Sequence, residues 1–213
     1  KPEELAPMMA VNPKLALDAY QFIHSFNLEK SSTKQAIFAY DGIAYLGLQP
    51  ETFTDNDLLY AQDHMIMLSG LYGIVRPLDK IKQYRLEMQT KFQNPKGETL
   101  YEYWADAINK YFARQLGEKG KVWVNLTSSE YAKIINPKLL PKGTVRINPV
   151  FKEEQPNGSF KQIVVYTKKA RGMMAHYILK NRLTDPEDLK GFDYEGYIFN
   201  PSLSNKKEWL FTR

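Results

Sequence analysis

The segment 68–79 constrains the fold of this 213-residue chain more than any other, because a helical pattern breaks there at two glycines. Gly70 and Gly73 are three residues apart, and Arg76 is followed at once by Pro77, which cannot continue a helix. Glycine lets another molecule approach the backbone N–H groups closely, so these glycines beside an arginine suit a bound phosphate. The alternative is a tight hairpin between two packed helices, since glycine-containing helix connections are common.

Composition fits a globular protein of one large domain or two small ones. The chain contains no cysteine, which excludes a disulfide framework, zinc–thiolate sites and a thiol nucleophile, and which fits a reducing cytoplasm. No apolar run approaches the ~20 residues that cross a bilayer, and no signal peptide is recognisable, so we expect a cytoplasmic protein without membrane association. The net charge of +5 and the isoelectric point of about 9.1 favour an acidic partner.

No repeat or low-complexity block divides the chain. We therefore expect a single domain over residues 1–213, with an α/β (α+β) fold in which helices surround a mixed β-sheet. Helices are predicted at 2–11, 13–26, 34–40 and 54–69 and after the turn at 94–97; 42–49 is predicted to be a loop. Strands are predicted at 83–92, 121–126, 144–151, 160–167, 191–199 and 208–212.

A basic stretch at 168–172 follows the strand expected at 160–167, where the apolar period changes from 2 to 3.6. We therefore expect a helix to begin here, with Lys168, Lys169 and Arg171 at its start. The N-terminus of a helix already carries partial positive charge, so a bound anion would stabilise three cations at this place. The alternative is a solvated basic turn, as most charge runs are.

Polar residues also gather at 125–131, between an expected buried strand and a short helix. In a functional interpretation, Ser129, Glu130 and Tyr131 lie at the carboxyl end of the strand, where α/β sheets tend to place ligand contacts. The alternative is that Ser128 or Ser129 caps the helix, which explains most of the pattern without chemistry.

Common catalytic and metal-binding patterns are missing from the sequence. There is no P-loop, no G-x-G-x-x-G after a strand and no G-x-S-x-G elbow. His24, His64 and His176 are scattered without i, i+4 pairing. We therefore predict no metal site and no cofactor.

Four short motifs follow one another along the chain. They are Ser-Gly-Leu-Tyr-Gly-Ile-Val-Arg-Pro-Leu-Asp at 69–79, Tyr-Arg-Leu-Glu-Met at 84–88, Asn-Leu-Thr-Ser-Ser-Glu-Tyr at 125–131 and Lys-Lys-Ala-Arg-Gly at 168–172. In this order and separation they resemble the bacterial peroxide stress protein YaaA family, over essentially the whole chain. The family begins with a short strand and an Ile-Ser-Pro-Ala-Lys-Thr-like segment. This chain starts after that point, so we expect the natural N-terminal segment to be missing from it.

The resemblance implies a cytoplasmic protein that protects cells from hydrogen peroxide by limiting intracellular iron and the resulting damage to DNA and protein. It also implies DNA binding on a family-specific fold, with a helix-hairpin-helix element and a basic cleft. Two segments are candidates for that element. Segment 2–26 has the helix, short connection and helix, with Lys14 at the turn, whereas 55–79 has the glycines. We favour 2–26 on layout.

Our leading hypothesis is a protein that binds double-stranded DNA through phosphates, without strong sequence preference, and for which no protein partner is evident. The alternative is an enzyme acting on a phosphorylated small molecule or nucleotide in a basic pocket, with Glu130 or Tyr131 as acid or base. An iron-sequestering role is the least supported of the three hypotheses, because the chain lacks cysteine and clustered histidines. The predicted phosphate-binding residues are Lys14, Gly70, Gly73, Arg76, Arg85, Lys168, Lys169 and Arg171; the enzyme hypothesis adds Glu87 and Ser129.

Overall fold

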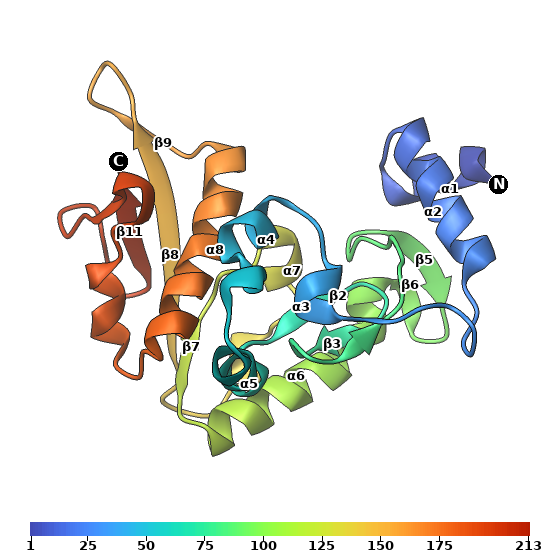
Figure 1. The fold of residues 1–213 in the computed structure, drawn as a ribbon, viewed down its shortest axis with the longest axis horizontal. Helices are drawn as coiled ribbons and strands as arrows, with labels where there is room; N and C mark the ends of the chain where they lie inside the picture. Colours follow the sequence, from blue (N-terminus) through green and yellow to red (C-terminus); the bar gives the residue numbers. More distant parts are fainter. The chain divides into compact units, whose positions relative to one another are not determined.

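The computed structural model describes residues 1–213, which form two compact units built from segments that alternate along the chain (Figure 1). Unit 1 comprises residues 1–39, 65–115 and 128–140; unit 2 comprises residues 40–64, 116–127 and 141–213. The expected mixed α/β fold is confirmed. Neither unit is a continuous piece of sequence, and the single domain over 1–213 stays a prediction. No helix is both long enough and apolar enough to cross a bilayer.

Unit 2 is organised around a five-stranded mixed sheet in the order β10–β11–β8–β7, with β9 paired to the end of β8. Strands β7 and β11 run parallel to β8, whereas β9 and β10 are antiparallel to their neighbours. The bounds are β7 Val122–Val124, β8 Val145–Glu154, β9 Phe160–Lys161, β10 Ile198–Phe199 and β11 Glu208–Thr212.

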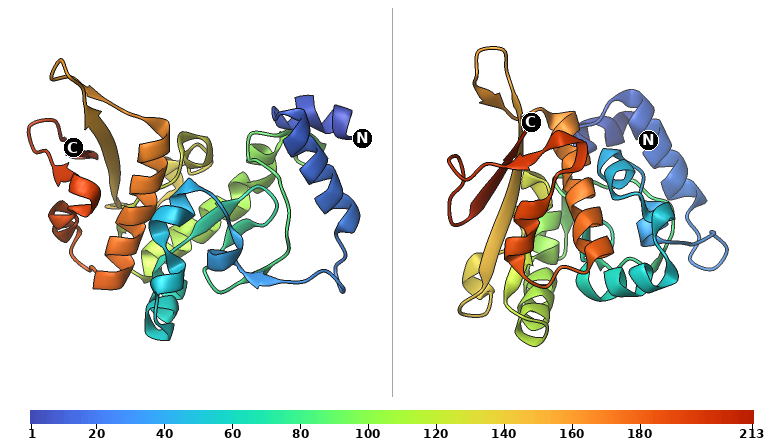
Figure 2. Two further views of the ribbon diagram at one scale, coloured as in Figure 1. Left: turned by 45° about the horizontal axis from the view of Figure 1, so that its top comes forward. Right: turned by 60° about the vertical axis from the view of Figure 1, so that its left-hand side comes forward.

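One face of this sheet is covered by the long helix α8 (Val164–Asn181), which runs beside β8 in both views of Figure 2. Alternate residues of β8 are buried, so Ile147 and Phe151 join Ala170 and Met174 of α8 in the core. The chain after α8 completes this core with Leu189, which lies in the 3-10 helix η3 (Pro186–Gly191), and with Phe192, which follows η3 directly. A second 3-10 helix, η4 (Tyr194–Gly196), comes next along the chain.

Two shorter helices of unit 2 pack against α8 as well. They are α4 (Ile43–Leu48) and α5 (Asp55–His64), joined through the 3-10 helix η1 (Pro50–Thr52). The His176 ring of α8 forms a hydrogen bond with the Leu48 carbonyl through Nδ1, at 2.7 Å, so the end of α4 is tied to α8.

Unit 1 contains two helices that pack side by side, α1 (Pro2–Met9) and α2 (Pro13–Ser25) (Figure 1). Its strands form three two-stranded antiparallel pairs, β1–β4, β2–β3 and β5–β6. Their bounds are β1 Lys34–Gln35, β4 Lys80–Ile81, β2 Met67–Ser69, β3 Gly73–Val75, β5 Lys91–Asn94 and β6 Gly97–Thr99. The remaining elements are α3 (Ala36–Ala39), α6 (Leu100–Glu118, of which residues up to 115 belong to this unit), α7 (Ser129–Ala132) and η2 (Pro137–Leu139).

Two predictions around the glycine segment are wrong. The helix expected over 54–69 ends at His64, and Met67–Ser69 is strand β2, so the two glycines lie in a β-hairpin and do not follow a helix. The strand expected over 83–92 is irregular up to position 90, and only Lys91–Asn94 is a strand. Strand pairing across 69–73 outweighed the helical pattern that the sequence carries there.

Three predictions in unit 2 are also wrong. The strand expected over 191–199 is limited to β10, because η3 reaches Gly191 and η4 occupies Tyr194–Gly196. Segment 42–49 is not a loop but contains helix α4, whose Gly47 packs against α8. The strand expected over 160–167 is limited to β9, because α8 already begins at Val164. The β-branched pair at 164–165 favours a strand locally, but burial of Ala170, Met173 and Met174 along α8 selects the helix.

Candidate functional site

Three of the four sequence motifs come together in unit 1. Ser69, at the end of β2, lies 2.6 Å from the Tyr84 hydroxyl oxygen through its Oγ atom. The same Oγ accepts the backbone N–H groups of Leu71 and Tyr72, at 3.2 and 2.9 Å. Ser69 therefore holds the tip of the hairpin and connects it to the motif at 84–88.

Both glycines of the hairpin lie against other parts of unit 1. A β-carbon on Gly70 would lie 2.4 Å from the Leu86 carbonyl oxygen, and one on Gly73, which has φ +71°, would lie 2.6 Å from the Trp104 ring. The Trp104 indole N–H also donates to the Gly70 carbonyl, at 2.8 Å. Close packing alone therefore requires a glycine at each position, and their contact with phosphate stays a prediction.

The two arginines of these motifs already have partners within the protein. Arg76 donates from Nη1 to the Tyr111 hydroxyl at 2.6 Å and to the Gln115 side-chain oxygen at 3.5 Å. Arg85 forms an ion pair with Glu87, with 2.9 Å between Nη2 and Oε1, and both side chains are about one-third exposed. A phosphate would compete with these partners for the two guanidinium groups.

Glu130 connects the third motif to the second. Its Oε1 accepts the backbone N–H of Gln89 at 3.2 Å, and its carbonyl accepts the Tyr101 hydroxyl at 3.0 Å. Burial raises the pKa of Tyr101, and the nearby Glu130 carboxylate raises it further. Tyr131 lies half-buried on the same short helix, α7. Ser128 occupies the N-cap position of α7 but makes no side-chain cap hydrogen bond, so the expected capping role of Ser128 is not found.

The fourth motif lies in unit 2, on α8. Because α8 begins at Val164, Lys168, Lys169 and Arg171 lie beyond its first turn. The argument from unpaired N–H groups at a helix start therefore does not apply to them. Lys169 forms an ion pair with Glu195, and Glu195 also pairs with Arg213, with 3.2 Å between oxygen and nitrogen. The charge of Lys169 is therefore balanced within the protein.

Lys168 and Arg171 differ from Lys169, because neither forms a hydrogen bond or an ion pair within the protein. They are three residues apart on α8 and so share one side of the helix. Lys168 is exposed, whereas Arg171 is partly buried, and this burial lowers the pKa of Arg171. Lys14, in the first turn of α2, is also exposed and without a protein partner. Among the predicted cations, these three are available to a ligand.

The polar network that holds Lys169 could not be predicted from the sequence. Arg213 donates to Glu153 at 2.8 Å, and the Tyr197 hydroxyl donates to the same carboxylate. Burial, with the Glu153 carboxylate, raises the pKa of Tyr197 far above its usual value. Glu195 adopts φ 51°, unusual for a residue other than glycine. Apart from Glu195 and Tyr197, the residues of this network are far apart in sequence.

Two hollows in the structure lie away from the predicted residues. One, of about 460 Å³ in unit 2, is lined by residues including Phe160, Ile198 and Arg213. The other, of about 300 Å³ in unit 1, is lined by residues including Tyr101, Asn109 and Leu139. None of the predicted site residues lines either hollow, so these hollows do not join the four motifs into one pocket.

The chain is similar to a described protein family and to individual known proteins. The family described as peroxide stress protein YaaA matches residues 1–203 of this chain. The chain is 44% identical over 215 aligned positions to a UPF0246 protein of Saccharophagus degradans, covering 100% of this chain and 83% of the relative. It is 43% identical over 214 positions to a UPF0246 protein of Acaryochloris marina, with the same shares covered.

Proposed function

This chain belongs to the peroxide stress protein YaaA family, and from that premise we propose that it is a DNA-binding protein of the hydrogen peroxide stress response. It binds duplex DNA through phosphates and does not depend on base sequence, because backbone contacts carry no base information. In the cell it limits intracellular iron and the damage that iron and peroxide cause to DNA and protein. It acts in the cytoplasm.

The observation that carries this proposal is that Arg171 and Lys168 on α8 have no acidic partner within the protein. A guanidinium that is partly withdrawn from water without a carboxylate beside it is destabilised unless an anion binds to it. Lys168 adds a second cation, which is exposed, on the same side of the helix. Together they suit two phosphates of a nucleic-acid backbone.

The α1–α2 pair of unit 1 supports a separate phosphate contact. Ala10 turns the chain in the left-handed conformation at φ 53°, and Asn12 caps α2 by accepting the Leu15 N–H at 3.0 Å. Lys14 then lies at the positive end of α2, where a helix favours an anion. This layout fits the helix-hairpin-helix element that we propose for 2–26. Segment 55–79 does not, because its glycines join two strands.

A salt-dependent titration with duplex DNA tests the proposal. Each neutralised phosphate contributes about −0.9 to the slope of log affinity against log salt, so Lys168 and Arg171 of unit 2 predict a slope at least as steep as about −1.8. Duplexes of unrelated sequence should give similar affinities. A slope near zero, or no binding at low salt, would remove the DNA proposal.

A second candidate function is an enzyme, favoured by the convergence of the first three motifs in unit 1. Ser69 contacts Tyr84, Arg85 pairs with Glu87, and Glu130 holds the backbone at Gln89, so three separated segments meet through polar groups. Such groups are the types that orient a substrate and transfer a proton. A substitution of Glu130, described below, distinguishes the two functions.

A further inference from the structure

Arg146 on β8 has an unusual position for a cation on a sheet. Its guanidinium lies over the Trp123 ring of β7, 4.5 Å from the ring centre. The two residues are register partners in the parallel β7–β8 pair, so they lie on the same face of the sheet. This is the face opposite the core, because the next residue along β8, Ile147, packs against α8.

Side-chain amides fix the orientation of this arginine. Its Nε donates to the Asn148 side-chain oxygen at 2.8 Å, and Asn125 donates to the same oxygen at 2.9 Å. The Asn148 amide in turn donates to the Lys207 carbonyl at 2.9 Å. The guanidinium is thus held in one plane by the indole below it and by the amide beside it.

The charge of Arg146 is not balanced within the protein. Its only hydrogen-bond acceptor is the neutral Asn148 amide, so both terminal nitrogens lack a protein acceptor. Burial lowers the pKa of Arg146, and no acidic group opposes this effect. The acid nearest in register is Glu208, which lies opposite Asn148 on β11 and forms no ion pair with Arg146. A held, partly desolvated guanidinium with two free nitrogens is organised to receive an anion.

We propose that Arg146, seated on the Trp123 ring and held by Asn148, is a binding site for a phosphate group. The planar fork of its two terminal nitrogens matches two phosphate oxygens, which a lysine cannot do. The phosphate belongs either to a nucleic-acid backbone or to a free small molecule. The site does not depend on the DNA-binding proposal.

Protection of the native protein from phenylglyoxal, which modifies guanidinium groups, tests this site without any substitution. Inorganic phosphate and a short DNA duplex are the two probes, and mass spectrometry follows each arginine separately. At ten times its dissociation constant, a probe bound at this site should slow modification of Arg146 about tenfold. Arg114 is the matched control, because it is also stacked on an aromatic ring, Tyr111, at 5.4 Å, but is exposed on α6.

The two probes identify the source of the phosphate. Protection by inorganic phosphate assigns a free phosphate or small phosphorylated ligand, and protection by the duplex alone assigns the DNA backbone. If the duplex does not bind anywhere, DNA binding is contradicted, but the test of Arg146 with inorganic phosphate remains valid. Modification of Arg146 at the unprotected rate with both probes, or equal protection of Arg114, overturns the proposal.

Substitutions give an independent check. Arg146→Gln should weaken binding of the protecting probe at least about tenfold, and Arg146→Lys, which keeps the charge without the fork, should recover only part of the loss. Arg114→Gln should bind as the wild type does. Wild-type affinity in Arg146→Gln contradicts the proposal, and so does full recovery in Arg146→Lys, which would show that charge alone suffices.

Discussion

Gly172 of α8 lies so close to Ala44 of α4 that a β-carbon on Gly172 would lie 1.8 Å from the Ala44 carbonyl oxygen. The approach is reciprocal, since a β-carbon on Gly47 would lie 2.2 Å from the Lys169 carbonyl oxygen. One glycine on each helix therefore lets the two backbones touch. The contact also fixes the turn of α8 that carries Lys168 and Arg171, which links helix packing to the proposed phosphate contacts.

Gly172→Ala should destabilise the protein, because the new methyl group meets backbone and not the end of a flexible side chain. Overpacking of this kind costs typically about 1–3 kcal/mol, which outweighs the ordinary gain from alanine in a helix. Gly117→Ala is the matched control, since Gly117 is also helical but has nothing within 4 Å of its β-carbon position. Thermal unfolding should show a lower midpoint for the first variant and an equal or higher one for the second. Equal midpoints for the two variants would contradict the close contact between the backbones of α4 and α8.

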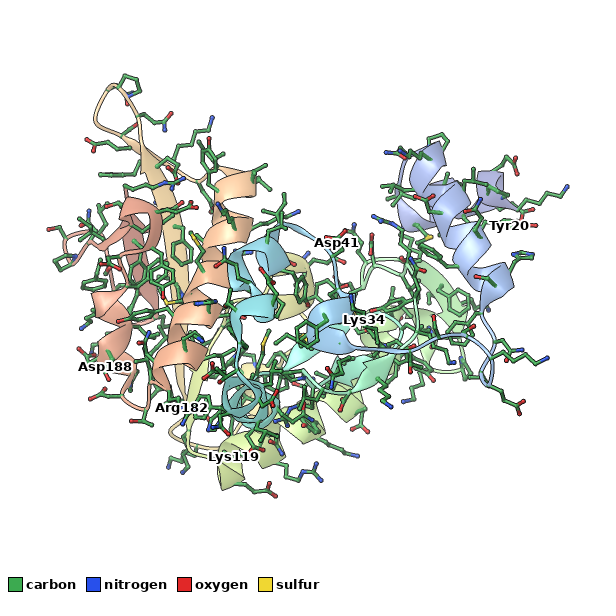
Figure 3. The ribbon with its side chains drawn as sticks, in the orientation of Figure 1. Tyr20, Lys34, Asp41, Lys119, Arg182 and Asp188 are labelled. Carbon is green, nitrogen blue, oxygen red and sulfur yellow. The ribbon has the colours of Figure 1, made fainter.

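Asp57 joins the start of α5 to the end of α8. Its carboxylate accepts from Lys180 at 2.8 Å and from the Thr54 backbone N–H at 3.0 Å, and Arg182 (labelled in Figure 3) lies 3.7 Å away. The hydrogen bond from Lys180, followed by those from Thr54, holds the pKa of Asp57 far below its usual value. The ionised carboxylate therefore stabilises the folded state at neutral pH.

The depressed pKa of Asp57 predicts a specific loss of stability in acid. The stabilisation is fully present above the unfolded pKa of about 3.9 and is lost progressively as the pH falls below it. In Asp57→Asn this contribution is absent at every pH. Urea unfolding midpoints measured from pH 6 to pH 3 should therefore fall more steeply in the wild type than in the variant. Parallel curves would show that the Asp57–Lys180 pair contributes little.

Long periodic elements could be predicted from the sequence. Helices α1, α2 and α6 and the strands β7, β8 and β11 lie where their apolar spacing and their Pro and Gly punctuation predict them. The short helix α4 could not be predicted, because its Gly47 favours a loop locally and only the contact with α8 explains it. Hairpin β2–β3 likewise depends on pairing across the glycines and not on local preference.

The residue types of the candidate site could be predicted from the sequence, but not which of its cations are paired with an acidic side chain. The sequence singles out Lys168, Lys169 and Arg171 equally, since adjacent cations look alike. Only the fold distinguishes them, because Glu195, distant in sequence, pairs with Lys169 alone. Arg146 cannot be singled out from the sequence for the same reason: its significance comes from Trp123 on a neighbouring strand and from the absence of an acid beside it.

Glu130→Gln distinguishes a DNA-binding protein from an enzyme. Glutamine keeps an oxygen that can accept the Gln89 N–H, so the thermal midpoint should hardly change. If DNA binding is the function, duplex affinity stays equal or rises slightly, because a negative charge is removed, and cells remain protected from peroxide. Loss of protection with normal folding and normal DNA binding would instead favour the enzyme, since Glu130 would then take part in chemistry. Peroxide survival assays and duplex titrations provide the two measurements.

The double variant Lys168→Ala with Arg171→Ala should bind duplex DNA more weakly, and the loss should be similar on unrelated sequences. Removing two phosphate contacts should make the slope of log affinity against log salt less steep by about 1.8. The matched control is Lys169→Ala with Glu195→Gln, which removes an ion pair and leaves the net charge unchanged. Its salt slope should equal that of the wild type, because the charge of Lys169 is already balanced by Glu195. An unchanged slope in the first variant would show that Lys168 and Arg171 make no phosphate contact, and equal losses in both variants would show that α8 is disturbed as a whole.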